Sequence, residues 1–240
     1  MLVTLTIVRY PKRFVFFALL SMAVFRLPFW LNKNVSFSKL MGSGRNGTFD
    51  KHPDWQQWAI LAVYKTAPAL EMLNEKIIIN QLYGSFVNKW VRFFNCETWT
   101  VFLTPIEGRG YWDGKEPFGQ LPKQTGYEGP VTVLTRATIR FSKLSAFWKN
   151  VAGVAHSMEG AQGFVSSLGI GEIPFIKQAT LSTWETKDAM KKFAYQMQQH
   201  TTVIRKTRDE NWYSEELFVR FKPLKTMGTI KGNDPLSGKL

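Results

Sequence analysis

The sequence has few of the residues that build most metal and redox sites. It contains one cysteine, Cys96, and three histidines, His52, His156 and His200. A single cysteine excludes an intramolecular disulfide, a CxxC redox pair and a thiolate metal cluster. Three histidines argue against a multi-histidine zinc site, because zinc takes three or four protein ligands.

Acidic residues are scarce relative to basic ones. The 240 residues include 31 Lys and Arg against 18 Asp and Glu, which gives a formal net charge of +13. This charge makes an anionic partner plausible, either nucleic acid, lipid headgroups or an acidic protein, although it can also serve solubility alone. With 45% apolar and 15% aromatic residues, the composition is that of a globular chain with one large domain or two small ones.

No uninterrupted apolar run reaches the roughly 20 residues that a bilayer-spanning helix needs. The run at 14–25 reads FVFFALLSMAVF and is followed by Arg26 and Pro28. It resembles the hydrophobic region of a signal peptide, but the preceding residues 2–8, LVTLTIV, have a strand pattern and not a charged start. The sequence therefore predicts a strand and then an apolar helix, which is either buried or in contact with a membrane. Burial is the favoured interpretation.

Two halves of the chain share turn residues and strand patterns. Residues 97–118 align with 215–236 at a constant offset of 118, with identical Glu, Val, Gly and Pro residues along the match. A second match, at offset 131, joins 8–17 to 139–148, and a third joins Gly42-Ser43-Gly44 to Gly169-Ile170-Gly171. Three matches in the same order favour an internal duplication.

Each half predicts the element order β-α-β-β-α-β, which is the ferredoxin-like unit. The expected strands are 2–10, 35–44, 58–64, 97–105, 131–140, 164–171, 178–184 and 215–223, and the expected helices are 12–25, 67–90, 142–158 and 186–208. The expected fold class is α+β, with two tandem ferredoxin-like (βαββαβ) repeats packed sheet to sheet, similar to a dimeric αβ-barrel. The expected domains are an N-terminal repeat over 1–110, a linker over 111–130, a C-terminal repeat over 131–227 and a loose tail over 228–240.

His200 is the first candidate for chemistry, because it breaks the symmetry of the two halves. At offset 118 the first half has Leu82 in its place. A lone histidine on a helix is sufficient as the axial ligand of haem iron, although a surface histidine in a polar helix is the alternative. Arg205 follows and could pair with haem propionates, or belong to a solvated basic face. A carboxylate of Glu215 or Glu216 could hydrogen-bond an iron-bound imidazole, or the pair could be turn residues.

Other candidates have simpler explanations. His156 is expected in the core or at its edge, and His52 in an exposed loop. Cys96 follows two phenylalanines and is expected to be an inert, packed thiol. The glycines at 42–47, GSGRNG, lack the GxxxxGK[ST] order of a phosphate loop, and a hairpin or bulge explains them better.

Several runs of this sequence resemble the spheroidene monooxygenase family of carotenoid biosynthesis. They are MGSGRNGTF followed by PDWQQWAILAVY, GPVTVLTRATIR, LGIGEIPFIKQATLSTW and WYSEELFVRF, and the resemblance covers about 35–225. It implies a haem-containing monooxygenase that uses O2 and an external, ferredoxin-type electron donor to add keto groups to acyclic carotenoids such as spheroidene. The histidine of the family pattern FAYxxxxxH falls on His200.

The resemblance therefore implies haem b with His200 as the iron ligand. Tyr195, Arg205 and Trp212 are the further expected cofactor-binding residues; no distal acid or arginine is carried over from the family, and no catalytic residue is assigned. The expected location is the cytoplasm, with peripheral contact to the inner membrane through the basic surface. An oligomer is compatible with the sequence, and nucleic acid is not an expected partner.

Two alternatives stay open. A tandem RNA-recognition module would have the same element order and basic charge, but the RNP1 pattern does not occur. A cofactor-free αβ-barrel oxygenase or an isoprenoid-binding protein would keep the fold and lose the metal.

Overall fold

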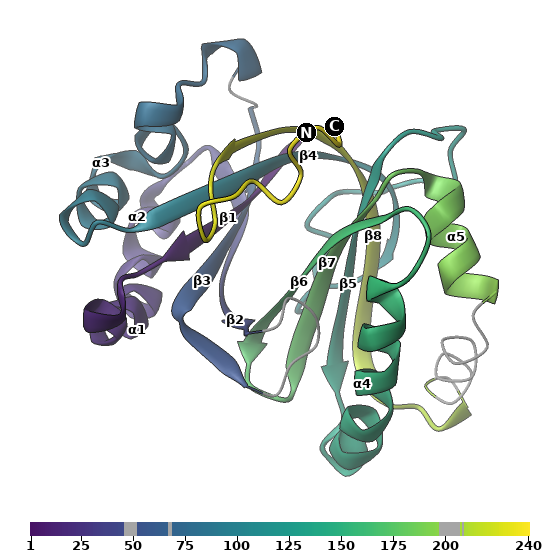
Figure 1. Ribbon diagram of the computed structural model, residues 1–240. Helices are drawn as coiled ribbons and strands as arrows, with labels where there is room; N and C mark the ends of the chain where they lie inside the picture. Colours follow the sequence, from purple (N-terminus) through teal and green to yellow (C-terminus); the bar gives the residue numbers. More distant parts are fainter. Residues whose placement is uncertain (46–51, 67–68, 197–206, 208) are drawn as a thin grey trace.

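The computed structural model describes residues 1–45, 52–66, 69–196, 207 and 209–240, and of residues 151–157, 195 and 196 it describes the backbone alone. The described elements place strands and helices in both halves, so the α+β class is confirmed (Figure 1). In chain order they are β1 (Leu2–Arg9), α1 (Val15–Val24), α2 (Arg26–Leu31), β2 (Val35–Gly44), β3 (Pro53–Tyr64), α3 (Ile78–Phe93), β4 (Glu97–Gly110), β5 (Val131–Ile139), α4 (Leu144–Glu159), β6 (Phe164–Ile173), β7 (Lys177–Trp184), α5 (Lys187–Gln196) and β8 (Tyr213–Gly228). Short 3-10 helices occupy Lys12–Phe14, Leu70–Met72, Glu75–Ile77 and Phe141–Lys143.

All eight strands join one closed antiparallel barrel in the order β1-β3-β2-β6-β7-β5-β8-β4. Each half contributes four neighbouring strands in the same relative order. The halves meet at two seams, where β2 pairs with β6 at Gly42 and Ser43, and β4 pairs with β8 from Trp99 to Gly110. The barrel expected from the sequence is therefore confirmed, with inward side chains of both halves in one shared core, and the tandem ferredoxin-like repeats stay a prediction. The sheets share their edges, and closure removes the unpaired edge strands that two separate sheets would have.

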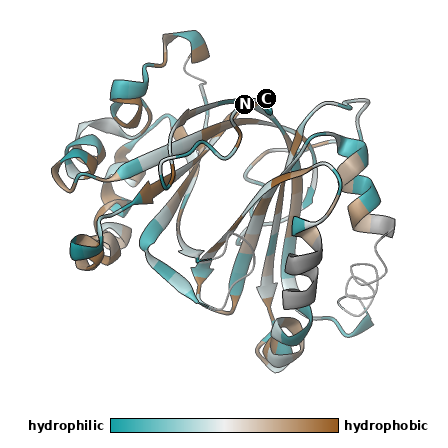
Figure 2. Ribbon diagram, viewed as in Figure 1, coloured by the Kyte–Doolittle hydropathy of each residue, from teal (hydrophilic) through white to brown (hydrophobic). Residues whose placement is uncertain are grey.

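The barrel interior is a packed apolar core. Along each strand, alternate side chains point inward. Figure 2 shows hydrophobic residues, in brown, along the strands. The inward set includes Leu5 on β1, Leu61 on β3, Val101 on β4, Leu134 on β5 and Val219 on β8, all of them buried. Side chains therefore fill the described part of the barrel interior.

The linker and the tail both belong to this core. Trp112 and Phe118 of the linker and Leu236 of the tail are buried among the inward-facing side chains. The side chain of Asp234 accepts hydrogen bonds from Trp99 Nε1 at 2.8 Å and from Thr226 Oγ1 at 2.5 Å. The expectation of a loose tail over 228–240 is therefore wrong, since an apolar residue in this segment closes one end of the barrel.

Helices cover the outside of each half. In the first half, α1, α2 and α3 lie over one continuous apolar cluster that includes Phe25, Phe29 and Tyr83. The apolar helix expected at 12–25 is in fact a 3-10 turn followed by α1 and α2, and it reaches Leu31. In the second half, α4 and α5 lie over β5–β8 (Figure 1).

Candidate functional site

The outer face of the second half differs from that of the first half. Its described side chains form two clusters. The first surrounds Trp184 and Phe193 beside α5, and the second surrounds Phe147 and Trp212 beside the start of α4.

Small polar side chains occupy the strands between these two clusters. Thr135 pairs with Thr180, and Ser167 pairs with Ser182. The hydroxyls of Ser167 and Thr180 are buried and have no hydrogen-bond partner among the described residues. A buried hydroxyl without a hydrogen-bond partner destabilises the fold. Such a hydroxyl therefore marks a place where a water molecule or a ligand can supply the hydrogen bond.

Thr135 on the outer face of β5 marks a place that the described side chains leave exposed, which we call the opening. Its side chain is exposed, although Val133 and Ala137 on the same face of the strand are buried. In the first half, Thr6 on β1 is fully buried, and its hydroxyl lies 2.7 Å from the hydroxyl of Tyr83 on α3. A packed tyrosine thus closes one face, and an opening with a small polar floor lies on the other. Apolar walls with a few polar groups are the usual lining of a small-molecule site.

Of the four predicted cofactor-binding residues, Trp212 is the one whose side chain the structure describes. Trp212 is buried in the second of the two clusters, and its indole Nε1 donates to Glu210 Oε2 at 2.9 Å. His200 and Arg205 lie outside the described residues, and of Tyr195 only the helical backbone is described. The proposed iron ligand therefore stays a prediction from the sequence.

The acidic pair before the last strand separates into two environments. Glu215 accepts hydrogen bonds from the backbone N–H groups of Asp113 and Gly114 and from Arg136. Glu216, by contrast, is exposed and pairs with Ala137, so it stands on the outer face of β8. Of the two, Glu216 is the carboxylate on the face that carries the opening.

The remaining sequence candidates lie away from this opening. Cys96 is partly buried in the first half, and burial raises the pKa of its thiol to about 12, as expected for an inert thiol. His52 is exposed beside β3, as expected. The side chain of His156 lies outside the described residues. Gly42 and Gly44 lie at the end of β2, and the register with β3 shifts between them, as expected for a bulge.

Sequence reasoning missed a buried ionic cluster around Glu107. Its carboxylate accepts hydrogen bonds from Lys187 on α5, from Arg220 on β8, and from the backbone and hydroxyl of Thr125 in the linker. Burial raises the pKa of Glu107, but these donors outweigh it and lower the pKa to about 2. The partners of Glu107 lie far apart in the sequence, so no local sequence pattern predicts that they contact one another. The cluster fixes the start of α5, the helix that leads toward His200.

A second network lies at one end of the barrel. Asp113 contacts Lys39, Lys177 and Arg136, of which Arg136 is fully buried. Burial raises the pKa of Asp113, but Lys177 and Lys39 outweigh it and bring the pKa to about 2. A separate hollow of about 290 Å³ lies between β4, β8 and the linker, at the small end of the roughly 300–1,000 Å³ typical of ligand sites. The ion pairs of Asp113 hold the start of the linker against β2, β5 and β7.

No family model matches the chain, but curated proteins do. It is 36% identical over 222 residues to a spheroidene monooxygenase of Rhodobacter capsulatus, covering 91% of this chain and 88% of that protein. It is 32% identical over 196 residues to one of Rubrivivax gelatinosus, covering 82% of this chain and 72% of that protein. A third, from Cereibacter sphaeroides, is 36% identical over 205 residues, which are 85% of this chain and 60% of that protein's length.

Solved structures share the fold at low identity. An aldoxime dehydratase aligns over the whole chain with a TM-score of 0.62 and 9% identity, covering 87% of that protein. Another, in complex with butyraldoxime, aligns with a TM-score of 0.61 and 9% identity, covering 85% of that protein. These likenesses show the fold alone. The identity and coverage of the curated relatives show that the chain belongs to the spheroidene monooxygenase family.

Proposed function

We propose that this protein is a haem-dependent monooxygenase that introduces a keto group into an acyclic, spheroidene-like carotenoid, using O2 and an external, ferredoxin-type electron donor. One observation carries the proposal: 36% identity to the Rhodobacter capsulatus spheroidene monooxygenase over 88% of that protein's length. The proposed framework is a pair of ferredoxin-like units closed into one barrel. The second unit would hold the cofactor.

The opening over Thr135 is the place where we propose that the porphyrin binds. A porphyrin is flat and apolar, with two carboxylates at one edge. The aromatic clusters around Trp184 and Trp212 would flank it, and the floor of small residues leaves room above β5. The unpartnered hydroxyls of Ser167 and Thr180 are the polar groups that a bound molecule or its waters would satisfy.

The proposed residue roles follow from chemistry and sequence position. His200 would bind iron through one imidazole nitrogen, which suffices for haem. Arg205 would pair with a propionate through its guanidinium group. Trp212, already buried, would support the wall beside them. When bound, haem supplies the activation of O2, and the protein sets the axial ligand, the polarity and the access of substrate.

The partners fit the charge and the composition. A carotenoid is long and apolar, so its binding surface should be apolar and aromatic. A chain with a net charge of +13 suits an acidic, ferredoxin-type protein, because complementary charge speeds the encounter of the two proteins. The proposed location is the cytoplasmic side of the inner membrane, where both partners are accessible.

The test is an absorption spectrum of full-length protein made with adequate iron and porphyrin precursor, before and after dithionite and CO. A Soret band that shifts with CO supports haem, and His200→Ala should remove or weaken it while the far-UV circular dichroism stays unchanged. His52→Ala is the matched control, since His52 is exposed away from the opening. A colourless preparation would overturn the haem proposal and favour a cofactor-free oxygenase. Product analysis in a carotenoid-producing host tests the substrate, and unchanged carotenoids would overturn that part.

A further inference from the structure

The helices α1 and α2 present an apolar stripe to the outside. Buried residues of the pair fall at Ala18, Ser21, Phe25 and Phe29, which is the spacing of one helix face. On the opposite face, a surface helix normally carries polar side chains. Here the exposed positions with the same spacing are apolar, namely Phe16, Leu19, Leu20, Leu27, Trp30 and Leu31, with exposed fractions from 40% to 81%.

The stripe continues onto α3 through aromatic contacts. Phe16 contacts Phe17, which stacks on Phe94 with 4.6 Å between the ring centroids. Phe94 in turn contacts Phe93 at 4.9 Å. Phe93 at the end of α3 is 79% exposed, and Phe86 on the same helix is 47% exposed. We call these eight exposed side chains of α1, α2 and α3 the N-terminal apolar face; they are Phe16, Leu19, Leu20, Leu27, Trp30, Leu31, Phe86 and Phe93.

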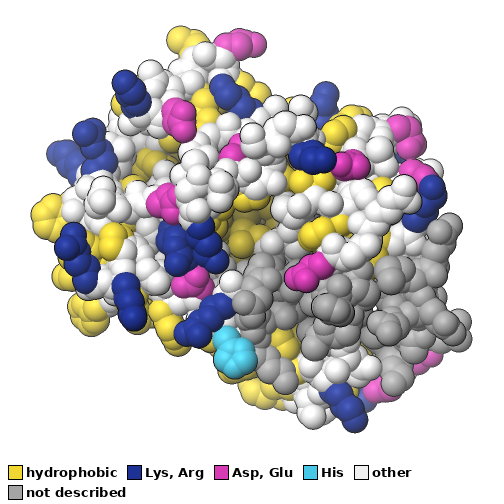
Figure 3. Space-filling model, viewed as in Figure 1, with side chains coloured by type: hydrophobic (Ala, Val, Ile, Leu, Met, Phe, Trp, Pro, Cys, Tyr) yellow, Lys and Arg dark blue, Asp and Glu magenta, His cyan; other side chains and the backbone are white. Residues whose placement is uncertain are grey.

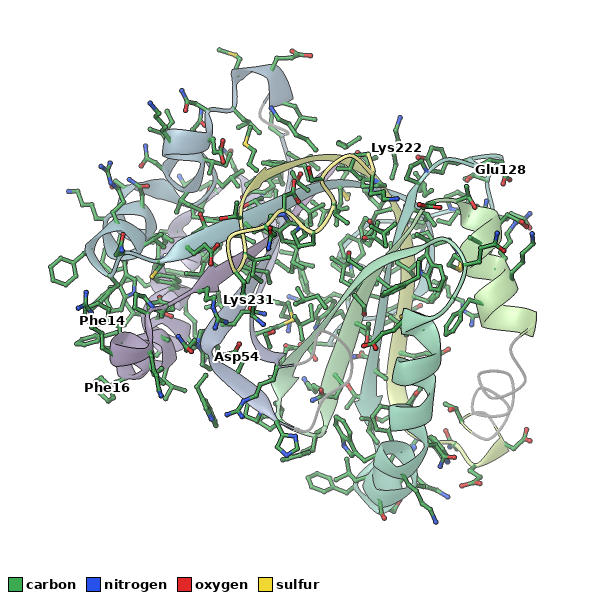
Figure 4. The ribbon with its side chains drawn as sticks, viewed as in Figure 1. Phe14, Phe16, Asp54, Glu128, Lys222 and Lys231 are labelled. Atoms are coloured by element: carbon green, nitrogen blue, oxygen red, sulfur yellow. The ribbon has the colours of Figure 1, made fainter. Side chains whose placement is uncertain are left out.

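Basic residues surround this face, and acidic residues are absent from its elements. Residues 1–49 contain no Asp or Glu, and neither do residues 76–96. Lys12, Arg13, Arg26 and Lys33 are exposed next to or between the apolar positions of α1 and α2. Figure 3 shows yellow and dark blue side chains together at the left side of the molecule, where these helices lie in Figure 1. Figure 4 shows Phe16 pointing away from the ribbon there.

We propose that the N-terminal apolar face binds an anionic lipid bilayer, with α1 and α2 lying in the plane of the interface. Apolar side chains enter the boundary between headgroups and acyl chains, and the flanking Lys and Arg contact anionic headgroups. Charge complementarity decides the partner. A second copy of this chain would bring the same basic residues against each other, whereas an anionic bilayer neutralises them.

The helices lie on the membrane and do not cross it. Among the described residues, Lys12–Leu31 is the one segment long and apolar enough to span a bilayer by length and composition. Its inner face, however, forms part of the core. Phe29 packs on Tyr83 with 5.2 Å between the ring centroids, and Phe25 packs on Trp90 at 5.8 Å. Insertion across a bilayer would remove these contacts and expose the apolar cluster of the first half.

The experiment is co-sedimentation of the full-length protein with vesicles of phosphatidylcholine alone and of phosphatidylcholine with 30% phosphatidylglycerol. The triple variant Phe16→Ser, Leu20→Ser, Trp30→Ser removes three exposed apolar side chains and leaves every charge in place. Phe141→Ser is the matched control, because Phe141 is 77% exposed but lies in the second half beside Arg140 and Lys143. Circular dichroism and the unfolding midpoint show that each variant is folded.

The expected result is binding to the anionic vesicles that weakens about tenfold or more in the triple variant, and that is unchanged in Phe141→Ser. Binding should also fall when salt is raised from 50 to 500 mM, because part of it is electrostatic. Absence of binding, or equal binding by the triple variant, overturns the proposal. So does a wild-type dimer that the triple variant converts to a monomer, or binding that survives carbonate at pH 11. None of these outcomes depends on whether the protein holds haem.

Discussion

Glu97 and Glu215, which are 118 residues apart, each bind the turn that follows the strand in which the other residue lies. Glu97 begins β4 and accepts hydrogen bonds from the backbone N–H groups of Lys231 and Gly232, after β8. Glu215 lies at the start of β8 and accepts the N–H groups of Asp113 and Gly114, after β4. The two turns are also related by the offset of 118. The duplication stays a prediction, and this reciprocal arrangement supports it.

Replacing Glu97 with alanine is expected to lower the free energy of unfolding by about 1–3 kcal/mol, because the charge-assisted hydrogen bonds from the 229–232 turn are lost. Urea unfolding at pH 7 measures this loss. Glu128→Ala is the control, since Glu128 is exposed in the linker (Figure 4). An equal effect of the two substitutions would show that the hydrogen bonds between Glu97 and the 229–232 turn add nothing to stability.

Gly110→Ala should be far more destabilising than Gly114→Ala, although both glycines have a positive φ, of 93° and 70°. A Cβ on Gly110 would lie 2.1 Å from the carbonyl oxygen of Glu216, whereas one on Gly114 has no atom within 4 Å. We expect a loss of about 3 kcal/mol or more for Gly110→Ala and about 1 kcal/mol for Gly114→Ala. Thermal unfolding compares them, and similar midpoints would contradict the close approach of β4 to β8.

Glu107→Gln should cost about 3–5 kcal/mol at pH 7, because it leaves Lys187 buried without its carboxylate partner. The pKa of Glu107 is lowered from 4.5 to about 2, so its stabilising effect is fully present above about pH 4.5 and is lost as the pH falls through 2. The difference between wild type and variant should therefore shrink between pH 4.5 and pH 2. Urea unfolding across this range measures it, with Glu128→Gln as control. A difference that does not depend on pH would contradict the assigned cause.

Thr135→Phe should fill the opening over β5 and weaken haem binding about tenfold, which corresponds to about 1.4 kcal/mol, without lowering the unfolding midpoint. Haem titration of apoprotein followed in the Soret region measures the affinity. Thr66→Phe is the control, because Thr66 is exposed in the loop after β3. If both variants bind haem as tightly as wild type, the cofactor does not use this opening.

The sequence predicted the helix layer less well than the strands. Strand periodicity and turn residues placed all the expected strands, and β3, β4 and β8 are each at least five residues longer than expected. The run at 14–25 was expected to be buried, yet Phe16 and Leu20 are exposed. When a helix is apolar on all sides, its sequence does not indicate which face is buried. The sequence therefore could not predict that Phe16 and Leu20 are exposed.

The sequence by itself determined the order of the elements, the turns at the glycines and the family, because these depend on local residue patterns and on direct similarity. Only the tertiary structure decided how the two halves close into one barrel, how Glu107 and Lys187 meet, and where the opening over Thr135 lies. Those features arise from contacts between segments far apart in the chain. Packing and desolvation select such contacts, and no local pattern encodes them.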